Sequence, residues 1–229
     1  MGAALEIFKY RLHSEWLPEF CNDKNRMYPL TGFKLDSINV SDFDANNFLR
    51  ALDSGLVKDV GGGRYCCPKS ATFEQIFWEG KKSIIPRPIT LWNEPIITIG
   101  TIARLGLDFG WREETLCMQT KDGAFDFAIF KEACDQTEFV AGEVKKSEKE
   151  IDLLIADLIE FGEVGKTDCV NEPSKRMNSF KKWRALIERK AEFFWAVGPN
   201  NYSALYLMKY KAGDIAEFLQ VPLDTIKRT

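Results

Sequence analysis

Two short apolar runs decide the fold of this chain: AFDFAIF at residues 124–130 and FVAGEVK at residues 139–145. Side chains alternate between the two faces of a β-strand. In the first run, Phe125, Phe127 and Ile129 are therefore expected on one face and Asp126 on the other. This run predicts a strand that presents a single carboxylate opposite an apolar face.

The second run predicts a strand that carries two opposite charges on one face. The same period of two places Glu143 and Lys145 together, roughly 7 Å apart along the strand, with Val140 and Val144 opposite them. If the two strands are neighbours in one sheet, Asp126 and Glu143 can converge on a hard cation such as Mg²⁺. Lys145 would then hold or deprotonate a water nucleophile and offset charge on a reacting phosphate.

In these residues the chain resembles the PD-(D/E)XK, or restriction-endonuclease-like, nuclease superfamily. Its signature is an Asp, a variable gap and Glu-X-Lys on the following strand. Here it reads Asp126, sixteen residues, then Glu143-Val144-Lys145. Phe125 stands where the family pattern has a proline that is often missing.

A capped helix is expected directly after this motif, as the superfamily pattern also has it. Ser147-Glu148-Lys149-Glu150 reads as a capping box. The apolar positions that follow recur at helical spacing: Ile151, Leu154, Ile155, Leu158 and Ile159.

The resemblance implies an α/β fold with a restriction-endonuclease-like mixed central sheet flanked by helices, across about residues 91–210. It also implies Mg²⁺-dependent hydrolysis of nucleic-acid phosphodiesters, more often DNA, with Mn²⁺ as a substitute. Asp126 and Glu143 would hold the metal, the Val144 carbonyl could add a ligand, and Lys145 would position the water. The superfamily core opens with a helix that often lends an acid, for which Glu94 is the candidate. An equally good explanation is that Glu94 complements the dipole of its helix.

A basic helix is predicted at residues 175–190, where seven Lys or Arg stand against one Glu. Its polar face could lie along a phosphate backbone through Lys181, Lys182 and Arg184. A solvated basic face explains the same pattern equally well. Lys146, which follows the motif, is assigned a phosphate contact at most.

The N-terminal part is expected to be a separate helical segment at residues 1–88, followed by the nuclease-like domain at 89–229. A helix near residue 42, two short strands and the glycine turn at 61–63 have the outline of a winged helix. Any helix packed on a hairpin gives the same outline. Further elements are expected as follows: helices at 3–20, 70–80 and 214–220, strands at 114–120, 193–197 and 202–210, and an extended linker at 81–88.

Composition excludes several classes of site and leaves the partner open. The single histidine, His13, rules out centres built on several histidines, and the six cysteines include no Cys-x-x-Cys pair. Net charge is −3, with an acidic excess around the motif and a basic excess after it. No apolar run spans a membrane, so we expect a soluble cytoplasmic protein.

The expected partner is nucleic acid, and a homodimer is one possibility. Two other classes remain open: a nuclease-fold binding or regulatory module without turnover, and a winged-helix regulator whose C-terminal half is scaffold.

Overall fold

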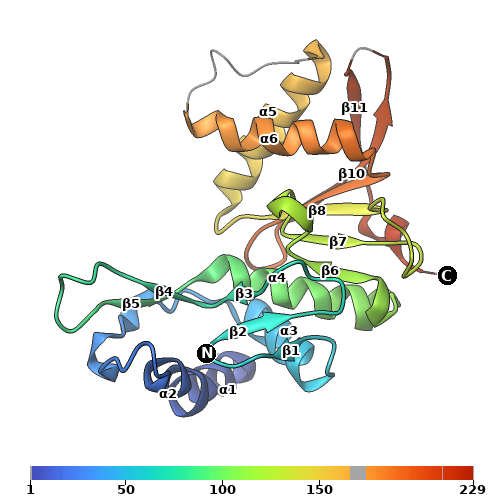
Figure 1. The fold of residues 1–229 in the computed structure, drawn as a ribbon. Helices are drawn as coiled ribbons and strands as arrows, with labels where there is room; N and C mark the ends of the chain where they lie inside the picture. Colours follow the sequence, from blue (N-terminus) through green and yellow to red (C-terminus); the bar gives the residue numbers. More distant parts are fainter. Residues whose placement is uncertain (1, 166–173, 213, 229) are drawn as a thin grey trace.

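The fold is mixed α/β, built on a six-stranded mixed sheet with helices on both faces (Figure 1). The computed structural model describes residues 2–165, 174–212 and 214–228. The strand order across the sheet is β11-β10-β9-β8-β7-β6. The strands are β6 (Leu116–Met118), β7 (Phe127–Ile129), β8 (Val140–Val144), β9 (Phe193–Val197), β10 (Ser203–Tyr210) and β11 (Ala216–Val221). The predicted fold class is confirmed at this level.

The direction of the strands explains where the helices lie. β6, β7 and β8 form an antiparallel meander, whereas β9 runs parallel to β8. Parallel neighbours need a long crossover, which here contains α5 (Glu148–Val164) and α6 (Ser174–Arg189). Figure 1 shows these two helices above the sheet and α4 (Asn93–Ala103) below it.

Each face of the sheet has its own hydrophobic core. The α4-side core contains Phe127, Ile129, Val140 and Val144. The α5–α6 core contains the opposite sheet face together with buried residues of both crossover helices: Ala141, Phe194, Ala196, Ile151, Leu154, Leu158, Phe161, Phe180 and Trp183. The alternation predicted for β8 is confirmed, because Val140 and Val144 lie in the core opposite to that of Ala141.

Phe125 does not follow the predicted alternation. It belongs to the α5–α6 core, whereas Phe127 and Ile129 lie in the α4-side core. Regular pairing of β7 starts only at Phe127. Before that point Phe125 closes a loop with Thr120, which accepts the Phe125 N–H at Oγ1 and donates its own N–H to the Phe125 carbonyl. Because Phe125 belongs to this loop and not to the regular strand, its side chain does not have to lie on the same face as Phe127 and Ile129.

The N-terminal part consists of helices and two small antiparallel sheets. The helices are α1 (Ala3–Arg11), a π-helical turn (Leu12–Trp16), α2 (Leu17–Asn22) and α3 (Asp42–Asp53). One sheet has the order β1 (Lys58–Asp59), β2 (Arg64–Cys66) and β3 (Glu74–Gln75), and β4 (Phe77–Glu79) pairs with β5 (Ile89–Leu91). Helix α3, the two strands and the glycine turn occur in the expected order, but this order alone does not establish a winged helix.

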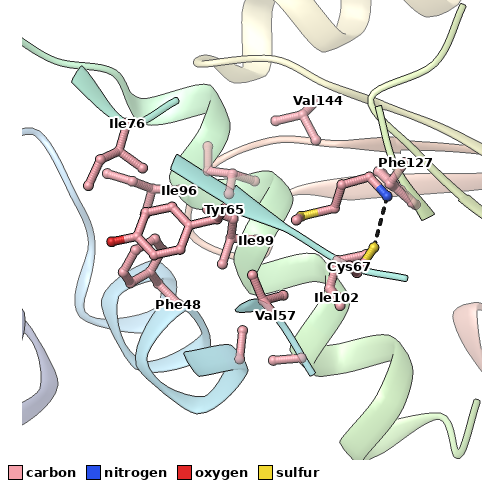
Figure 2. Packing of buried hydrophobic residues seen from close by; sticks show 14 of the residues in the cluster. Phe48, Val57, Tyr65, Cys67, Ile76, Ile96, Ile99, Ile102, Phe127 and Val144 are labelled. Carbon is pink, nitrogen blue, oxygen red and sulfur yellow. Dashed lines mark hydrogen bonds between the residues drawn. The ribbon is translucent and has the colours of Figure 1, made fainter. Parts of the chain in front are cut away.

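The N-terminal part and the central sheet share the α4-side core. Figure 2 shows Phe48 and Tyr65 of the N-terminal part packed with Ile99 of α4, and Phe127 of β7 belongs to the same cluster. Sγ of Cys67 accepts the backbone N–H of Met118 at 3.1 Å. Residues on both sides of position 88 therefore contribute to one cluster. The division into segments 1–88 and 89–229 stays a prediction.

Two predicted helices are strands, because pairing with neighbouring strands outweighs a local helical pattern. Residues 70–80 contain β3 and β4, and the expected linker at 81–88 is the loop of the β4–β5 hairpin. Residues 214–220 contribute to β11, which forms six pairs with β10. Its buried Ala216 and partly buried Phe218 alternate with exposed Glu217 and Leu219.

The other predicted elements form near their expected positions. Ser147 caps α5 by accepting the Glu150 N–H, and Gly165 ends that helix with φ 60°. Within the described residues, no helix is long and apolar enough to cross a membrane.

Candidate functional site

The site is centred on Glu143, which lies on the face of β8 that is turned toward α5 and α6. Its side chain is buried, with 3% of the residue exposed. Nζ of Lys145 lies 2.6 Å from Oε1 and Nζ of Lys182, from α6, lies 2.7 Å from Oε2. Both carboxylate oxygens therefore have an ammonium neighbour, which compensates the cost of burying this charge.

Asp126 lies beside Glu143 because of the β7–β8 register. Phe127 pairs with Gly142, so Asp126 and Glu143 come one residue beyond the last regular pair. Oδ2 of Asp126 accepts the backbone N–H of Val144 at 2.8 Å. Burial and the neighbouring Glu143 carboxylate raise the pKa of Asp126 to about 8, against the lowering effects of Lys182 and Lys145. The two predicted acids are thus brought together.

Gly142 leaves room for the side chain of Phe127, its partner across β7 and β8. A Cβ at this position would lie 2.0 Å from Cζ of Phe127. The Phe127 ring therefore occupies the space next to Gly142 on the face opposite the charges. A glycine is therefore needed at position 142 for packing, which the Glu-X-Lys motif does not predict.

Lys145 is held at both its backbone and its ammonium. Its N–H donates to the Val197 carbonyl at 3.0 Å, which continues the β8–β9 pairing. Its Nζ also donates to the Val144 carbonyl at 3.1 Å, the oxygen predicted as a metal ligand. Burial lowers the pKa of Lys145, but the carboxylates of Glu143, Asp126 and Glu94 together raise it more, so the net shift is upward. The ammonium form is therefore favoured.

Two further carboxylates lie near this centre, one predicted and one not. Glu94, in the first turn of α4, contributes to the upward pKa shift of Lys145. Glu74 of β3 is buried, and burial raises its pKa to about 7, with smaller contributions from Glu94 and Glu143. Gln119 Nε2 donates to Oε1 of Glu74 at 2.8 Å. The sequence does not predict Glu74 as a site residue. Its segment, residues 70–80, has a helical pattern, and only the strand β3 places Glu74 near Glu94 and Glu143.

A cavity of about 590 Å³ opens beside these charges. Its walls come from the start of α4, the end of β8 and the facing sides of α5 and α6. The lining includes Glu94, Glu143, Lys145, Leu154, Asp157 and Lys182. Cavities of this size admit part of a ligand. Glu143 and Lys145 of the motif line this cavity, whereas Asp126 is not part of its lining.

The donor atoms fit a divalent cation in their chemistry. Asp126 and Glu143 supply carboxylate oxygens and Val144 a carbonyl oxygen, which are the ligand types that Mg²⁺ takes alongside water. The pKa of Asp126 is raised mainly by burial and further by the charge of Glu143, and a cation would offset both effects. Among the residues that the structure describes, no three His, Cys or carboxylate side chains are grouped closely enough to hold a metal on their own.

The four residues predicted to contact phosphate lie in different surroundings. Lys182 lies in the site. Lys181 is exposed, and Arg184 pairs with Asp214 at 2.9 Å and with Glu188 at 3.2 Å. Lys146 lines the cavity, and its Nζ lies 3.6 Å from Glu150. The helix therefore does not present its three central cations as one free basic face.

The site thus combines the carboxyl groups of Asp126 and Glu143 with the ammonium groups of Lys145 and Lys182. Comparisons of this chain with protein-family models, with curated proteins and with solved structures gave no match.

Proposed function

We propose that this protein is a metal-dependent nuclease of the PD-(D/E)XK type that hydrolyses phosphodiester bonds of nucleic acid, with DNA as the expected substrate rather than RNA. The observation that carries the proposal is the juxtaposition of Asp126 and Glu143 across β7 and β8, with Nζ of Lys145 2.6 Å from Glu143. Two oxygen-donor acids and a lysine beside an open cavity are the groups that phosphodiester hydrolysis needs. A restriction-endonuclease-like topology for the sheet is part of the same proposal.

Asp126, Glu143 and the Val144 carbonyl are the groups that would hold Mg²⁺, or Mn²⁺ in its place. When bound, the cation supplies Lewis-acid stabilisation of the charge that develops on the scissile phosphate. Lys145 contributes a second positive charge from the protein itself. Because its pKa is raised, Lys145 acts as a hydrogen-bond donor to a phosphate oxygen or to the attacking water, rather than as the base that deprotonates this water.

Glu94 and Glu74 increase the negative charge of the site. Together with Asp126 and Glu143 they make four carboxyl groups, against the two ammonium groups of Lys145 and Lys182. The excess of carboxylates favours cation binding, and a cation at the site would in turn lower their pKa values. Glu94 lines the cavity, so it can also contact a ligand directly.

The second candidate function is a nucleic-acid-binding or regulatory module that keeps this fold without turnover. The observation that favours it is the 2.7 Å ion pair between Lys182 and Glu143. An ammonium group at this position can neutralise Glu143 permanently, as a metal would. The two candidates differ in one measurable property, which is whether the wild-type site binds a divalent cation.

The deciding experiment incubates the purified protein with supercoiled plasmid, single-stranded DNA and RNA, in Mg²⁺, in Mn²⁺ and in EDTA. We expect cleavage in either metal and none in EDTA. Glu143→Gln should abolish cleavage, because it removes a ligand charge and leaves the shape of the side chain. Binding of Mn²⁺ to both proteins is measured in parallel by calorimetry.

Matched controls come from exposed residues outside the site. Glu163→Gln on α5 and Lys209→Ala on β10 should cleave as the wild type does. Cleavage that survives in Glu143→Gln would indicate a contaminating nuclease or another site, and would refute the assignment. Binding of nucleic acid without Mn²⁺ binding or cleavage would select the non-catalytic module instead.

A further inference from the structure

Two of the six tryptophans are exposed, and they lie next to each other beside the candidate site. Trp78 is 58% exposed and Trp92 is 39% exposed, whereas Trp16, Trp111, Trp183 and Trp195 are buried. The rings of Trp78 and Trp92 have their centroids 5.7 Å apart and their planes at 74°. Large aromatic side chains exposed as a pair are uncommon on a protein surface that has no binding function.

Both tryptophans belong to the solvent-facing side of the β4–β5 hairpin. Trp78 pairs with Thr90, and the N–H of Trp92 donates to the Ile76 carbonyl at 2.8 Å, so Trp92 extends the same pairing. The opposite side of the hairpin is buried in the α4-side core through Phe77, Ile89 and Leu91. The hairpin is thus anchored on one side and displays the two indoles on the other.

The indole pair is connected to the candidate site through Glu94. Nε1 of Trp92 donates to Oε2 of Glu94 at 3.2 Å, and Glu94 lines the cavity together with Glu143 and Lys145. In Figure 1 the hairpin projects away from the region where α4 begins. Its loop carries Lys81 and Lys82, both exposed, and neither forms an ion pair with a residue that the structure describes. The two lysines of the hairpin loop, the two indoles and the cavity therefore lie in this order along the surface.

We propose that Trp78 and Trp92 form a stacking platform for unpaired nucleobases, which makes single-stranded or locally melted nucleic acid the substrate class of this site. This inference rests on the proposed nuclease function and specifies its substrate. The platform receives bases adjacent to the scissile phosphate, while Lys81 and Lys82 contact the phosphates further along the strand.

The chemistry of the surface selects this occupant. Every base has a π-face that stacks on an aromatic ring whatever the sequence, and lysines along the same path follow the backbone charge. In duplex DNA each base face is covered by the neighbouring base pair. A duplex therefore cannot stack a base on the indoles unless that base is first unstacked. Because the hairpin is anchored in the core through Phe77, Ile89 and Leu91, the rings are already held in place before binding, which reduces the ordering cost.

The test is done in EDTA, which separates binding from cleavage. The fluorescence anisotropy of end-labelled oligonucleotides gives the affinity, and the intrinsic fluorescence of the protein reports stacking on the indoles. The probes are an oligothymidylate of roughly twelve nucleotides, a length within the range of single-strand sites, an abasic oligonucleotide of equal length and a blunt duplex. We expect the oligothymidylate to quench the exposed indoles. The abasic strand should bind with little quenching, and the duplex should bind more weakly than the oligothymidylate.

The variants separate stacking from simple electrostatic attraction. Trp78→Ala and Trp92→Ala should each weaken oligothymidylate binding by roughly 5- to 150-fold, the cost of losing one base-stacking ring. Trp78→Phe should retain most of the affinity, since it keeps an aromatic face. Binding of the abasic strand should not change in any of them. Leu219→Ala, at an exposed apolar position on β11, should match the wild type throughout.

The outcomes distinguish this inference from the function on which it rests. If the wild type cleaves DNA in Mg²⁺ but the tryptophan variants bind oligothymidylate as tightly as the wild type, the platform is refuted and the nuclease stands. Stacking without cleavage in any metal supports the platform and refutes catalysis. A change in oligomeric mass in Trp78→Ala, with oligothymidylate binding intact, would assign the indoles to a protein interface and overturn the inference.

Discussion

Nζ of Lys182 on α6 lies 2.7 Å from Oε2 of Glu143 on β8, while Nζ of Lys145 lies 2.6 Å from Oε1 of the same carboxylate. The Lys182 side chain is only 15% exposed. An ammonium group and a divalent cation compete for the same carboxylate oxygens, because both are held there by charge. Lys182 is therefore expected to weaken the binding of a divalent cation at Glu143.

Lys182→Met should raise the affinity for Mn²⁺. Methionine keeps an unbranched apolar stem and removes the competing charge. We expect a gain of about one order of magnitude in affinity, equivalent to ~1.4 kcal/mol, measured by calorimetry without nucleic acid. Lys181→Met, the exposed neighbour, is the control and should leave the affinity unchanged. An affinity that is equal in the wild type and in Lys182→Met would show that Lys182 and the cation do not compete.

Lys145→Ala should abolish cleavage and leave Mn²⁺ binding largely intact, whereas Asp126→Ala should lose both. In the proposed mechanism, Lys145 contributes charge to the reacting phosphate, while Asp126 supplies a ligand oxygen. Plasmid cleavage and calorimetry on the same protein preparations separate the two effects. Nuclease activity retained in both variants would remove these residues from the active site.

Phe127→Ala should destabilise the fold by about 3–5 kcal/mol, as truncation of a buried phenylalanine does. Phe127 is fully buried in the α4-side core, where its ring contacts Trp195 with centroids 5.4 Å apart. Asp126→Asn should be nearly neutral or stabilising at neutral pH. Folding requires Asp126 to take up a proton at this pH, asparagine needs none, and its amide oxygen can still accept the Val144 N–H. Urea unfolding without metal measures both. A larger loss for Asp126→Asn would mark Asp126 as a structural carboxylate.

Without metal, the stability of the wild type should fall as pH rises from about 4 to about 8. The pKa of Asp126 rises on folding from 3.8 to about 8, and that of Glu74 rises from 4.5 to about 7. The folded state therefore binds more protons than the unfolded state within this window, and stability decreases with pH. Asp126→Asn should flatten the curve without abolishing the slope, because Glu74 remains. A wild-type curve that rises over this window would contradict both shifts.

Lys181→Gln should reduce the salt dependence of DNA binding, and Arg184→Gln should change it less. Lys181 is exposed, whereas Arg184 is already paired with Asp214 and Glu188. One lost phosphate contact removes about 0.9 from the slope of log affinity against log salt concentration. Fluorescence anisotropy over a range of NaCl concentrations measures this slope. If neither variant changes it, this part of α6 is solvated surface.

The sequence by itself determined the elements whose signals are local. The capping box at Ser147, the proline in the first turn of α4 and the alternation in β8 each act within a few residues, so these elements form where they were expected. The pairing of Asp126 with Glu143 was also readable, because two short strands that each carry a charge opposite an apolar face can bury both faces only in one register.

Tertiary structure alone decided the rest. Residues 70–80 and 214–220 have helical patterns but form strands, because they pair with β2, β5 and β10. Their own sequences do not predict this pairing. Lys182 looked like one cation among seven on a helix, and only the packing of α6 over β8 brings it to Glu143. Glu74 enters the site for the same reason, since burial and electrostatic neighbours depend on contacts between segments that are distant in the chain.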